Sequence, residues 1–223
     1  MAKVKVGTAT IDDAVKASLT RRDDHVIMLL TKRPDRLLAW QREHFPAGLP
    51  AWVWVMTTVE DQARANLRIP FLLQVKAAVR GVSMEPLLGP VDLDECGATP
   101  CDLPGGMPDH PEIPPHGAAW RGVQWVIAGG ESGPRARPSH PDWFRSLRDQ
   151  CAAANVPFHF KQWGEWAPDA DGDRCIAPDG RNMPNLEPNG SNGDGAARIR
   201  RIGKRRAGRV LDGRTHDDLP AVP

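Results

Sequence analysis

The sequence predicts an α/β fold with about five parallel β/α units. Apolar runs of strand length, rich in Val, Ile, Trp and Phe, recur along the chain, and each ends abruptly in polar residues. Helical patterns or loops separate these runs, and that alternation is typical of parallel sheets. The runs, with the residues that close them, are HVIMLLTKRP, AWVWVMTTVED, RGVSMEPLLGP, QWVIAGGESGP and PFHFKQWGEW.

The first two units each combine a strand with a helix. A strand at residues 25–30 passes through Pro34 into the helical pattern DRLLAWQREHF, and proline suits a helix start because its missing N–H would be unpaired there. The second strand, at residues 51–56, is followed by Thr57 and Thr58. Either threonine could cap the next helix, VEDQARANLRI, whose acidic first turn suits the helix dipole.

The later units follow the same plan less regularly. The third strand leads to Glu85, after which proline and the LLGPVDL turn forbid an immediate helix. The fourth leads through GGESG to the helix HPDWFRSLRDQCAAAN, which Ser139 and Pro141 are predicted to open. These strands are predicted at residues 79–83, 124–128 and 157–160.

Four segments are predicted around this repeating part. Residues 94–119 form an insertion dense in Pro and Gly, longer than a connection in a compact domain usually is. Residues 167–197, rich in Asp, Asn, Gly and Pro, are predicted as a long loop or flexible flap, and the basic close could add a short strand and a helical turn. The division is 1–24 (N-terminal segment), 25–166 (α/β part), 167–197 (flap) and 198–223 (basic segment).

Composition favours a globular cytoplasmic protein. The 29 basic and 28 acidic residues nearly cancel, so bulk charge gives no case for a nucleic-acid or membrane partner. No stretch approaches the roughly 20 apolar residues of a membrane span, and the N-terminus has no uninterrupted apolar core like that of a signal peptide. We therefore expect no membrane partner, and thiols or metal ligands rather than disulfides for the 4 cysteines.

The polar residues that close the strands are the first candidates for a site, because ligands of parallel α/β folds lie at the carboxyl ends of the strands. Lys and Arg suit a carboxylate or phosphate, and Glu suits an amine, a ribose hydroxyl or proton transfer. The alternative is that polar strand ends simply meet water. The candidates are Lys32, Arg33, Glu60, Glu85, Glu131, Ser132, Lys161 and Gln162.

Glycine and tryptophan residues near two strand ends extend this set. Gly129 and Gly130 allow close approach of the backbone to a ligand, or simply make a tight turn after a buried strand. Trp163 and Trp166 flank a glycine and could stack a base or adenine, or could cap the mouth of a barrel.

The insertion carries a set of soft and borderline metal ligands: Cys96, Cys101, His110 and His116. Both end spacings occur in zinc fingers, while the middle gap is shorter than usual. A closed zinc site would keep this long loop ordered, whereas histidines in Pro-rich loops are more often only solvated.

The C-terminal segment is locally basic. Residues 198–209 contain Lys and Arg but no acid, enough for a phosphate-binding patch that takes DNA or RNA, or for a solvated edge that balances the acidic flap. The candidate contacts are Arg198, Arg200, Arg201, Lys204, Arg205 and Arg206.

Several long motifs together resemble a known family. LLTKRPDRL, TTVEDQ, RIPFLLQVKAAVRGVSMEPLLGPVDL, WVIAGGESGPRARPSHPDWFRSLRDQCAAANVPFHFKQWGEW and GKRRAGRVLDG are similar to the phage gp thirty-seven / gp sixty-eight proteins, a domain of unknown function in the radical-SAM barrel group. The resemblance implies a partial TIM-like barrel of the radical-SAM type, S-adenosylmethionine as a cofactor, and the cytoplasm of a bacterial host.

The chain departs from the family at its N-terminus. Family members carry three closely spaced cysteines that would hold a four-iron, four-sulfur cluster, but the first cysteine here is Cys96. The resemblance thus implies an N-terminally truncated barrel that lacks the cluster: a remnant, a binding protein or one part of a split enzyme, unable to start radical chemistry alone. The alternative is a nucleic-acid-associated phage module with a zinc-stabilised insertion. An exposed sheet edge would favour a homodimer or a second chain that completes the barrel.

Overall fold

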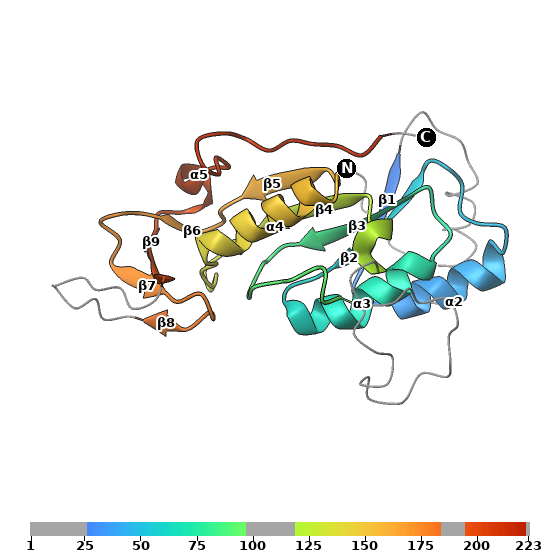
Figure 1. The fold of residues 1–223 in the computed structure, drawn as a ribbon, viewed down its shortest axis with the longest axis horizontal. Coiled ribbons are helices and arrows are strands. Elements are labelled where there is room, and N and C mark those ends of the chain that lie inside the picture. The colour runs from blue at the N-terminus through green and yellow to red at the C-terminus, as the bar shows by residue number, and fades with distance from the viewer. Residues whose placement is uncertain (1–25, 97–118, 184–194, 222–223) are drawn as a thin grey trace.

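The computed structural model describes residues 26–96, 119–183 and 195–221. Strands and helices alternate through most of this part of the chain, as predicted (Figure 1). The elements are β1 (Ile27–Thr31), α2 (Pro34–His44), β2 (Val53–Thr58), α3 (Gln62–Gln74), β3 (Val79–Met84), the 3-10 helix η2 (Ala119–Gly122), β4 (Trp125–Gly129), α4 (Pro141–Ala153) and β5 (Phe158–Gln162).

The main sheet has five parallel strands in the order β1-β2-β3-β4-β5. The order in space equals the order along the chain, which is the arrangement of a barrel, whereas a doubly wound sheet reverses at a switch point. The register pairs Ile27 with Val53 and Trp54 with Val79. The predicted α/β fold is therefore confirmed, and it is consistent with a partial TIM-like barrel.

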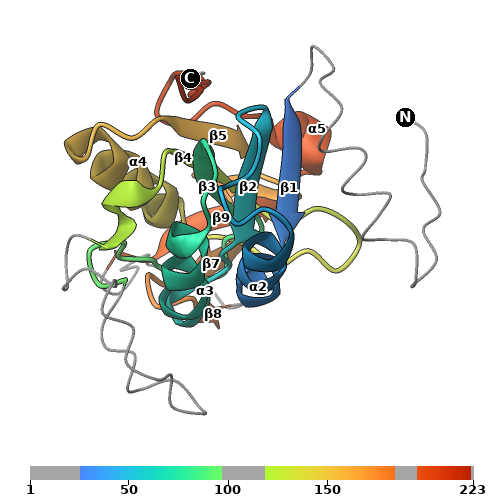
Figure 2. The ribbon, with the colours of Figure 1, turned by 90° about the vertical axis from the view of Figure 1, so that its right-hand side faces the viewer.

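The sheet separates two apolar clusters. Figure 2 shows α2, α3 and α4 on one side of the strands. Val53 and Val55 of β2 are fully buried in the larger cluster, which lies on that side, while the alternating Trp54 and Met56 belong to a smaller cluster on the opposite face. We call this opposite face the inner face, because it would line the interior of a closed barrel.

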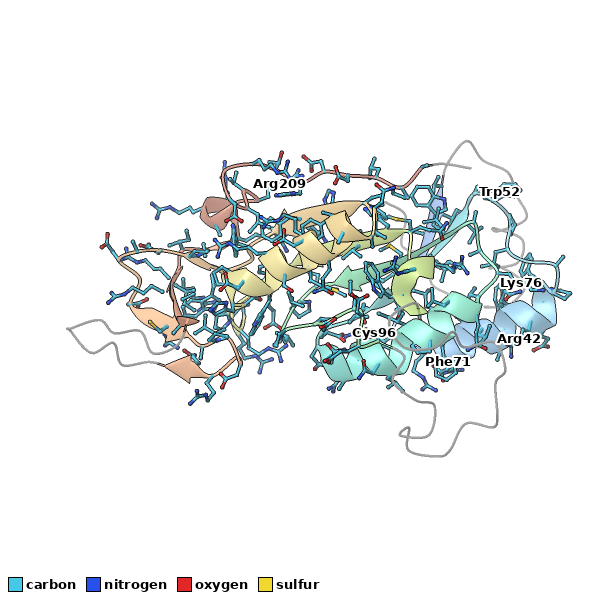
Figure 3. All side chains as sticks on the ribbon, in the orientation of Figure 1. Arg42, Trp52, Phe71, Lys76, Cys96 and Arg209 are labelled. Atoms are coloured by element: carbon cyan, nitrogen blue, oxygen red, sulfur yellow. The ribbon has the colours of Figure 1, made fainter. Side chains whose placement is uncertain are left out.

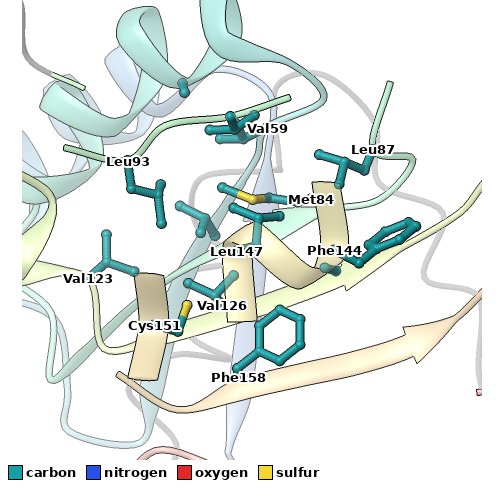
Figure 4. Packing of buried hydrophobic residues seen from close by; sticks show 14 of the residues in the cluster. Val59, Met84, Leu87, Leu93, Val123, Val126, Phe144, Leu147, Cys151 and Phe158 are labelled. Atoms are coloured by element: carbon teal, nitrogen blue, oxygen red, sulfur yellow. The ribbon is translucent and has the colours of Figure 1, made fainter. Parts of the chain in front are cut away.

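Helix α4 shows how the larger cluster is built. Phe144 and Leu147 of α4 lie over Val126 of β4 and Phe158 of β5, and all four are buried (Figure 4). Burial of each such side chain stabilises the fold by about 1.5–3 kcal/mol relative to exposure. The helix predicted after the fourth strand is therefore present and contributes to the core.

The predicted starts of α2 and α4 are confirmed, but the residue that caps α4 is not the one predicted. Pro34 and Pro141 each lie in the first turn of their helix. The residue that caps α4 is His140, whose side chain accepts the Asp142 N–H at 3.1 Å. Ser139, predicted to open this helix, instead donates its hydroxyl to the Leu87 carbonyl oxygen at 2.6 Å.

The prediction for the start of α3 is wrong. Neither Thr57 nor Thr58 caps it, because both belong to β2 and the residue directly before the helix is Asp61. The Asp61 carboxylate accepts the Arg64 N–H at 2.9 Å and is the cap. At the other end, α3 continues past Pro70 instead of ending before it, and the buried Leu72 gains its place in the core from that extra turn.

The predicted flap contains strands in the part that the structure describes. A second, antiparallel sheet has the order β6-β9-β7-β8, with β6 (Trp166–Pro168), β7 (Arg174–Ile176), β8 (Asn182–Met183) and β9 (Ala197–Arg201). Ile176 of the flap and Ile199 of the basic segment meet in this sheet, and each is 1% exposed. The short strand and helical turn predicted for the basic segment correspond to β9 and to α5 (Lys204–Ala207).

The C-terminal residues return along β5. The Phe160 N–H donates to the His216 carbonyl oxygen at 3.0 Å, and the Trp125 indole N–H donates to the Asp218 carbonyl oxygen at 2.9 Å. The free edge of β5 is thereby partly covered. Across the described ranges, no helix is both long and apolar enough to cross a membrane.

Candidate functional site

A glutamate follows each of the three central strands at its carboxyl end. Glu60 follows β2, Glu85 follows β3 and Glu131 follows β4. Each carboxylate contacts at least one basic side chain, at 2.6–2.8 Å. The strand ends therefore carry three ion-pair groups rather than isolated charges.

The Glu60 group joins β1, β2 and α3. The Glu60 side chain is 11% exposed, and its two oxygens contact Lys32 Nζ at 2.6 Å and Arg68 Nη1 at 2.7 Å. Burial alone would raise the pKa of this carboxyl, but Lys32 and Arg68 outweigh it and hold the pKa below the ordinary 4.5. Arg68 also donates to the Thr58 carbonyl oxygen at 2.9 Å, so the group is tied to the end of β2.

The Glu85 group, formed by Glu85, Ser132, Lys161 and Gln162, connects the ends of β3 and β5 to the loop after β4. Lys161 Nζ lies 2.7 Å from Glu85 Oε2, and Gln162 Nε2 donates to Glu85 Oε1 at 2.5 Å. The same amide nitrogen donates to Ser132 Oγ at 3.2 Å. These are four of the predicted candidates, and the fold brings them into one network.

Glu131 is held by a residue that the sequence analysis missed. Arg137 contacts it with two side-chain nitrogens, each at 2.8 Å, and with its backbone N–H at 2.7 Å. The hydrogen bonds from the Arg137 side chain lower the pKa of Glu131. In turn, the hydrogen bonds to Glu131 raise the pKa of Arg137, and the charge of Glu60 adds to this.

Arg137 could have been proposed as a site residue from the sequence, whereas Arg68 could not. Arg137 belongs to the run GPRARPSH that follows the fourth strand, a position where strand-end residues were already expected to contribute. Arg68 lies inside a helix, and nothing in the sequence distinguishes it from the neighbouring Arg64.

Arg33 does not join these groups. Its guanidinium binds Asp35 in the first turn of α2, and its side chain is 63% exposed. The hydrogen bond to Asp35 raises the pKa of Arg33, but the contact is local to the helix start. Of the eight strand-end candidates, the structure places Lys32 with Glu60, joins four around Glu85 and pairs Glu131 with Arg137.

The two candidate glycines are explained by close packing. A Cβ on Gly130 would lie 1.9 Å from the Trp163 carbonyl oxygen, so only glycine lets the ends of β4 and β5 approach this closely. A Cβ on Gly129 would lie 3.3 Å from the Glu85 carboxyl carbon. Gly129 therefore lies beside the Glu85 group, while Gly130 meets another part of the backbone rather than an open space.

The two tryptophans lie in the core. Trp163 is 7% exposed, and its ring meets Phe144 and Phe160 edge-on, with ring centres 5.3 and 5.0 Å apart. Its indole N–H donates to the Val210 carbonyl oxygen at 2.8 Å. Trp166 donates to the Ala136 carbonyl oxygen. This arrangement matches the capping alternative better than base stacking.

Cys96 is the one predicted zinc ligand that the described residues include (Figure 3). It is fully buried, its Sγ lies 3.4 Å from the Asp92 carbonyl oxygen, and burial raises the pKa of its thiol to about 12. Cys101, His110 and His116 lie outside the described residues, so the zinc site stays a prediction. Within the described ranges, no three His, Cys, Asp or Glu side chains are grouped to hold a metal ion.

The three described cysteines are all buried. Cys151 lies in α4 and Cys175 in β7, while Cys96 lies in a turn between β3 and η2. Burial raises the pKa of Cys96 and of Cys151 to about 12, which favours the neutral thiol. The absence of an iron–sulfur cluster stays a prediction.

The basic side chains of residues 198–223 are of two kinds: some contact an acid or a backbone carbonyl, and others, which we call free cations, have no such partner among the described residues. Arg200 contacts Asp169 at 3.2 Å, and Arg201 donates to the Pro134 carbonyl oxygen at 2.8 Å. Arg198 is half-buried on β9. The other three candidates lie exposed on α5, and in the described part of the chain their side chains have no ion pair or hydrogen bond: Lys204, Arg205 and Arg206.

A pocket of about 770 Å³ lies at the opposite end of the sheet, at the amino ends of β4 and β5. Arg121, Asn155 and Asp218 are among the residues that line it, and none of the strand-end candidates does. In TIM-like folds this end usually serves stability and the carboxyl end serves function. We therefore take the carboxyl end as the candidate site.

Comparison with known proteins identifies the family. The family model described as "Protein of unknown function (DUF5131)" matches residues 2–220. No curated protein and no solved structure matches the chain. Because the match covers nearly the whole sequence, this α/β protein with ion-paired strand ends belongs to the DUF5131 family of proteins of unknown function.

Proposed function

We propose that this chain is a ligand-binding protein, with its site at the Glu85 group, and that S-adenosylmethionine is the ligand to test first. The resemblance to radical-SAM-type phage proteins supports the choice of ligand. The observation that carries the proposal is the placement of Glu85, Lys161 and Gln162 in one network at the carboxyl ends of parallel strands.

The Glu85–Lys161 pair has the right chemistry for the amino-acid part of this ligand. Glu85 is 16% exposed and Lys161 is 54% exposed, so a solute can reach the lysine and approach the carboxylate. A ligand that carries an ammonium and a carboxylate group can replace this ion pair charge for charge, with the ammonium on Glu85 and the carboxylate on Lys161. After this exchange the half-buried Glu85 carboxylate still has a cationic partner, so no charge is left unpaired.

Binding is proposed in place of complete radical chemistry because the sequence lacks the three closely spaced cysteines of the radical-SAM-type proteins that it resembles, and because its described cysteines are buried. The chain is then a remnant of a radical-SAM-like enzyme that retains binding, or one part of a split enzyme whose second chain supplies the cluster. Either way, purified protein should contain no iron and no acid-labile sulfide.

The first experiment combines metal and sulfide analysis of anaerobically handled protein with calorimetric titration of S-adenosylmethionine. Glu85→Gln should weaken binding at least about tenfold, because the ammonium loses a charge-assisted hydrogen bond. The matched control is Glu43→Gln, whose carboxylate is 74% exposed on α2, and it should bind like the wild type. Equal affinities for wild type and Glu85→Gln would refute the site, and iron with labile sulfide would refute the absence of a cluster.

A second candidate function is a nucleic-acid-associated module with a zinc-stabilised insertion. The observation in its favour is the exposure of three adjacent cations on α5. DNA affinity should then fall steeply with salt and disappear when Arg198, Arg200, Arg201, Lys204, Arg205 and Arg206 are neutralised. Zinc near one equivalent, lost on substitution of Cys101 or His116, would support the insertion site; salt-independent or absent DNA binding would count against this function.

A further inference from the structure

The free cations of α5 lie at the same end of the sheet as the Glu85 group. The Gly203 N–H donates to the Glu165 carbonyl oxygen at 3.1 Å, just before α5, and the Trp163 N–H donates to the Gly208 carbonyl oxygen at 3.0 Å, just after it. Both ends of the turn are thus fastened to the residues that follow β5. Figures 1 and 2 show α5 beyond the carboxyl end of β5 and on the side of the sheet opposite α2, α3 and α4.

The two anchors keep α5 close to Lys161. Trp163 is two residues beyond Lys161 and Glu165 is four, so their Cα atoms lie at most about 7 and 14 Å from that of Lys161 even if the chain is fully extended. A single ligand of nucleotide size can bridge this range. The backbone at both ends of α5 therefore lies within reach of a ligand bound at the Glu85 group.

At the carboxyl end of the sheet the three strand-end glutamates have basic partners, whereas the three cations of α5 have no acidic partner among the described residues. Glu60, Glu85 and Glu131 are each matched by a basic partner. Glu165, the acid nearest the start of α5, accepts the Gly133 N–H at 3.2 Å through its carboxylate. Within the described ranges, the side chains of Lys204, Arg205 and Arg206 are left without a counter-charge, although two of their neighbours in sequence are held.

We infer that α5 is a phosphate-binding rim of the strand-end site, and that the substrate of this site carries a phosphate group. This inference rests on the proposed function in one respect, because it takes the Glu85 group as a ligand site; it adds a phosphate-bearing substrate, distinct from S-adenosylmethionine, whose remainder reaches that group. Exposed Lys and Arg side chains bind phosphate through charge-assisted hydrogen bonds, and a short turn fixed at both ends keeps three of them within one small region of the surface. The phosphate belongs either to a nucleotide or to a nucleic-acid strand, which share this chemistry.

The test titrates the full chain with inorganic pyrophosphate, ATP and a short single-stranded DNA at low salt. The rim variant is Lys204→Ala/Arg205→Ala/Arg206→Ala. Its control, Arg42→Ala/Lys76→Ala/Arg121→Ala, removes the same charge from exposed positions elsewhere, two of which Figure 3 labels at the end of the molecule away from α5. The rim variant should bind every phosphate probe at least about tenfold more weakly, and the control should not.

A second variant, Gln162→Ala, tests whether the rim and the Glu85 group bind the same ligand. Gln162→Ala should weaken ATP or DNA binding at least about threefold and leave pyrophosphate binding unchanged, because pyrophosphate reaches only the rim. Tighter binding of ATP by the wild type would indicate a nucleotide as the substrate, and tighter binding of DNA would indicate a nucleic-acid strand. Equal losses in the rim and control variants, no binding of any phosphate probe, or full ATP and DNA affinity in Gln162→Ala would each overturn the inference. S-adenosylmethionine titrated on the same samples reports separately on the proposed function.

Discussion

Glycine at position 130 is dictated by contact between two strand ends. A Cβ there would meet the Trp163 carbonyl oxygen at 1.9 Å, and a Cβ on Gly164 would meet the Glu131 carbonyl oxygen at 2.2 Å. The sequence marked a glycine-rich turn correctly but could not distinguish approach to a ligand from approach to another strand. The structure shows that backbone packing alone requires glycine at position 130.

This packing gives a prediction for stability. Gly130→Ala should lower the free energy of unfolding by about 1–3 kcal/mol or more, because the ends of β4 and β5 must separate. Urea denaturation followed by tryptophan fluorescence measures the change. Gly89→Ala is the control: the nearest atom to its Cβ is 3.6 Å away, so it should be nearly neutral. Equal stability of Gly130→Ala and wild type would show that the strand ends can adjust.

Glu60 makes stability depend on pH. Lys32 and Arg68 hold the pKa of its carboxyl below 4.5 in the folded state despite burial, so the unfolded chain binds a proton more readily. Its contribution is complete above pH 4.5 and is lost as the pH falls through the folded pKa. Glu60→Gln should therefore destabilise the protein at pH 7, by about 1–3 kcal/mol, and much less at pH 3.

The measurement is denaturant unfolding of the wild type and Glu60→Gln at both pH values. Glu43→Gln, with a carboxylate 74% exposed, should change little at either pH. A Glu60→Gln effect that is the same at pH 3 and pH 7 would mean that the lost contribution comes from packing rather than charge.

At the scale of elements, helix boundaries were predicted less well than helix existence. The sequence predicted a helix after the second strand, and α3 is present. Its cap is Asp61 rather than a threonine, because Thr57 is used by the sheet and donates its hydroxyl to the Thr31 carbonyl oxygen at 2.9 Å. From the sequence, several polar residues before the helix were of a type that caps helices. Because β2 extends to Thr58, the helix starts later and Asp61 is the residue in the capping position.

The cap can be tested directly. Asp61→Ala should cost about 0.5–2 kcal/mol of stability, because the Arg64 N–H loses its acceptor at the helix start. Asp61→Ser, which keeps an acceptor at the same place, should restore most of it. Thermal unfolding of the two variants measures the difference, and an equally large loss in Asp61→Ser would assign the effect to the carboxylate charge instead of the cap.

The antiparallel sheet could not be predicted from local pattern. The strands β6 to β9 are two to five residues long, so each is too short to show an alternation of apolar residues. Their pairing depends on residues far apart in the chain, for example Arg174 with Ile199. Ile176 and Ile199 become buried only after this pairing forms.

At the scale of the whole molecule, β1 presents an edge. In the described part of the chain β1 pairs with β2 alone, and three exposed large apolar side chains lie on it or directly before it: Val26, Met28 and Leu30, at 43%, 54% and 56%. Unpaired, apolar strand edges favour association with another strand. This exposed, apolar strand edge is the surface through which the dimer or partner chain expected from the sequence would bind.

We predict that the protein self-associates through this edge. Met28→Lys/Leu30→Lys should shift the molecule toward a monomer in light scattering over a range of concentrations, because charge on an edge strand opposes pairing. Leu67→Lys, at an apolar residue 42% exposed on α3, should leave the wild-type state unchanged. A wild-type protein that is monomeric at every concentration would exclude association with itself and leave a different partner chain as the occupant.

The sequence by itself determined the class and order of the main elements. The strands are rich in apolar residues, most continuously in β2 and β4, because central parallel strands are buried on both faces, and each apolar run ends at polar residues, because the strand ends leave the core. From this pattern alone, Glu60, Glu85, Lys161 and Gln162 could be placed at one edge of one sheet.

Only the tertiary structure decided which charges are paired and which are free. Arg68 and Arg137 reach their glutamates from a helix and a loop, Arg33 turns to its own helix, and α5 is returned to the end of β5 by two backbone hydrogen bonds. The arginine contacts span only two to eight residues of sequence, yet several acids lie within that reach, and only the folded backbone directs each guanidinium to one of them. The anchors of α5 join residues far apart in the chain, so no local pattern encodes them.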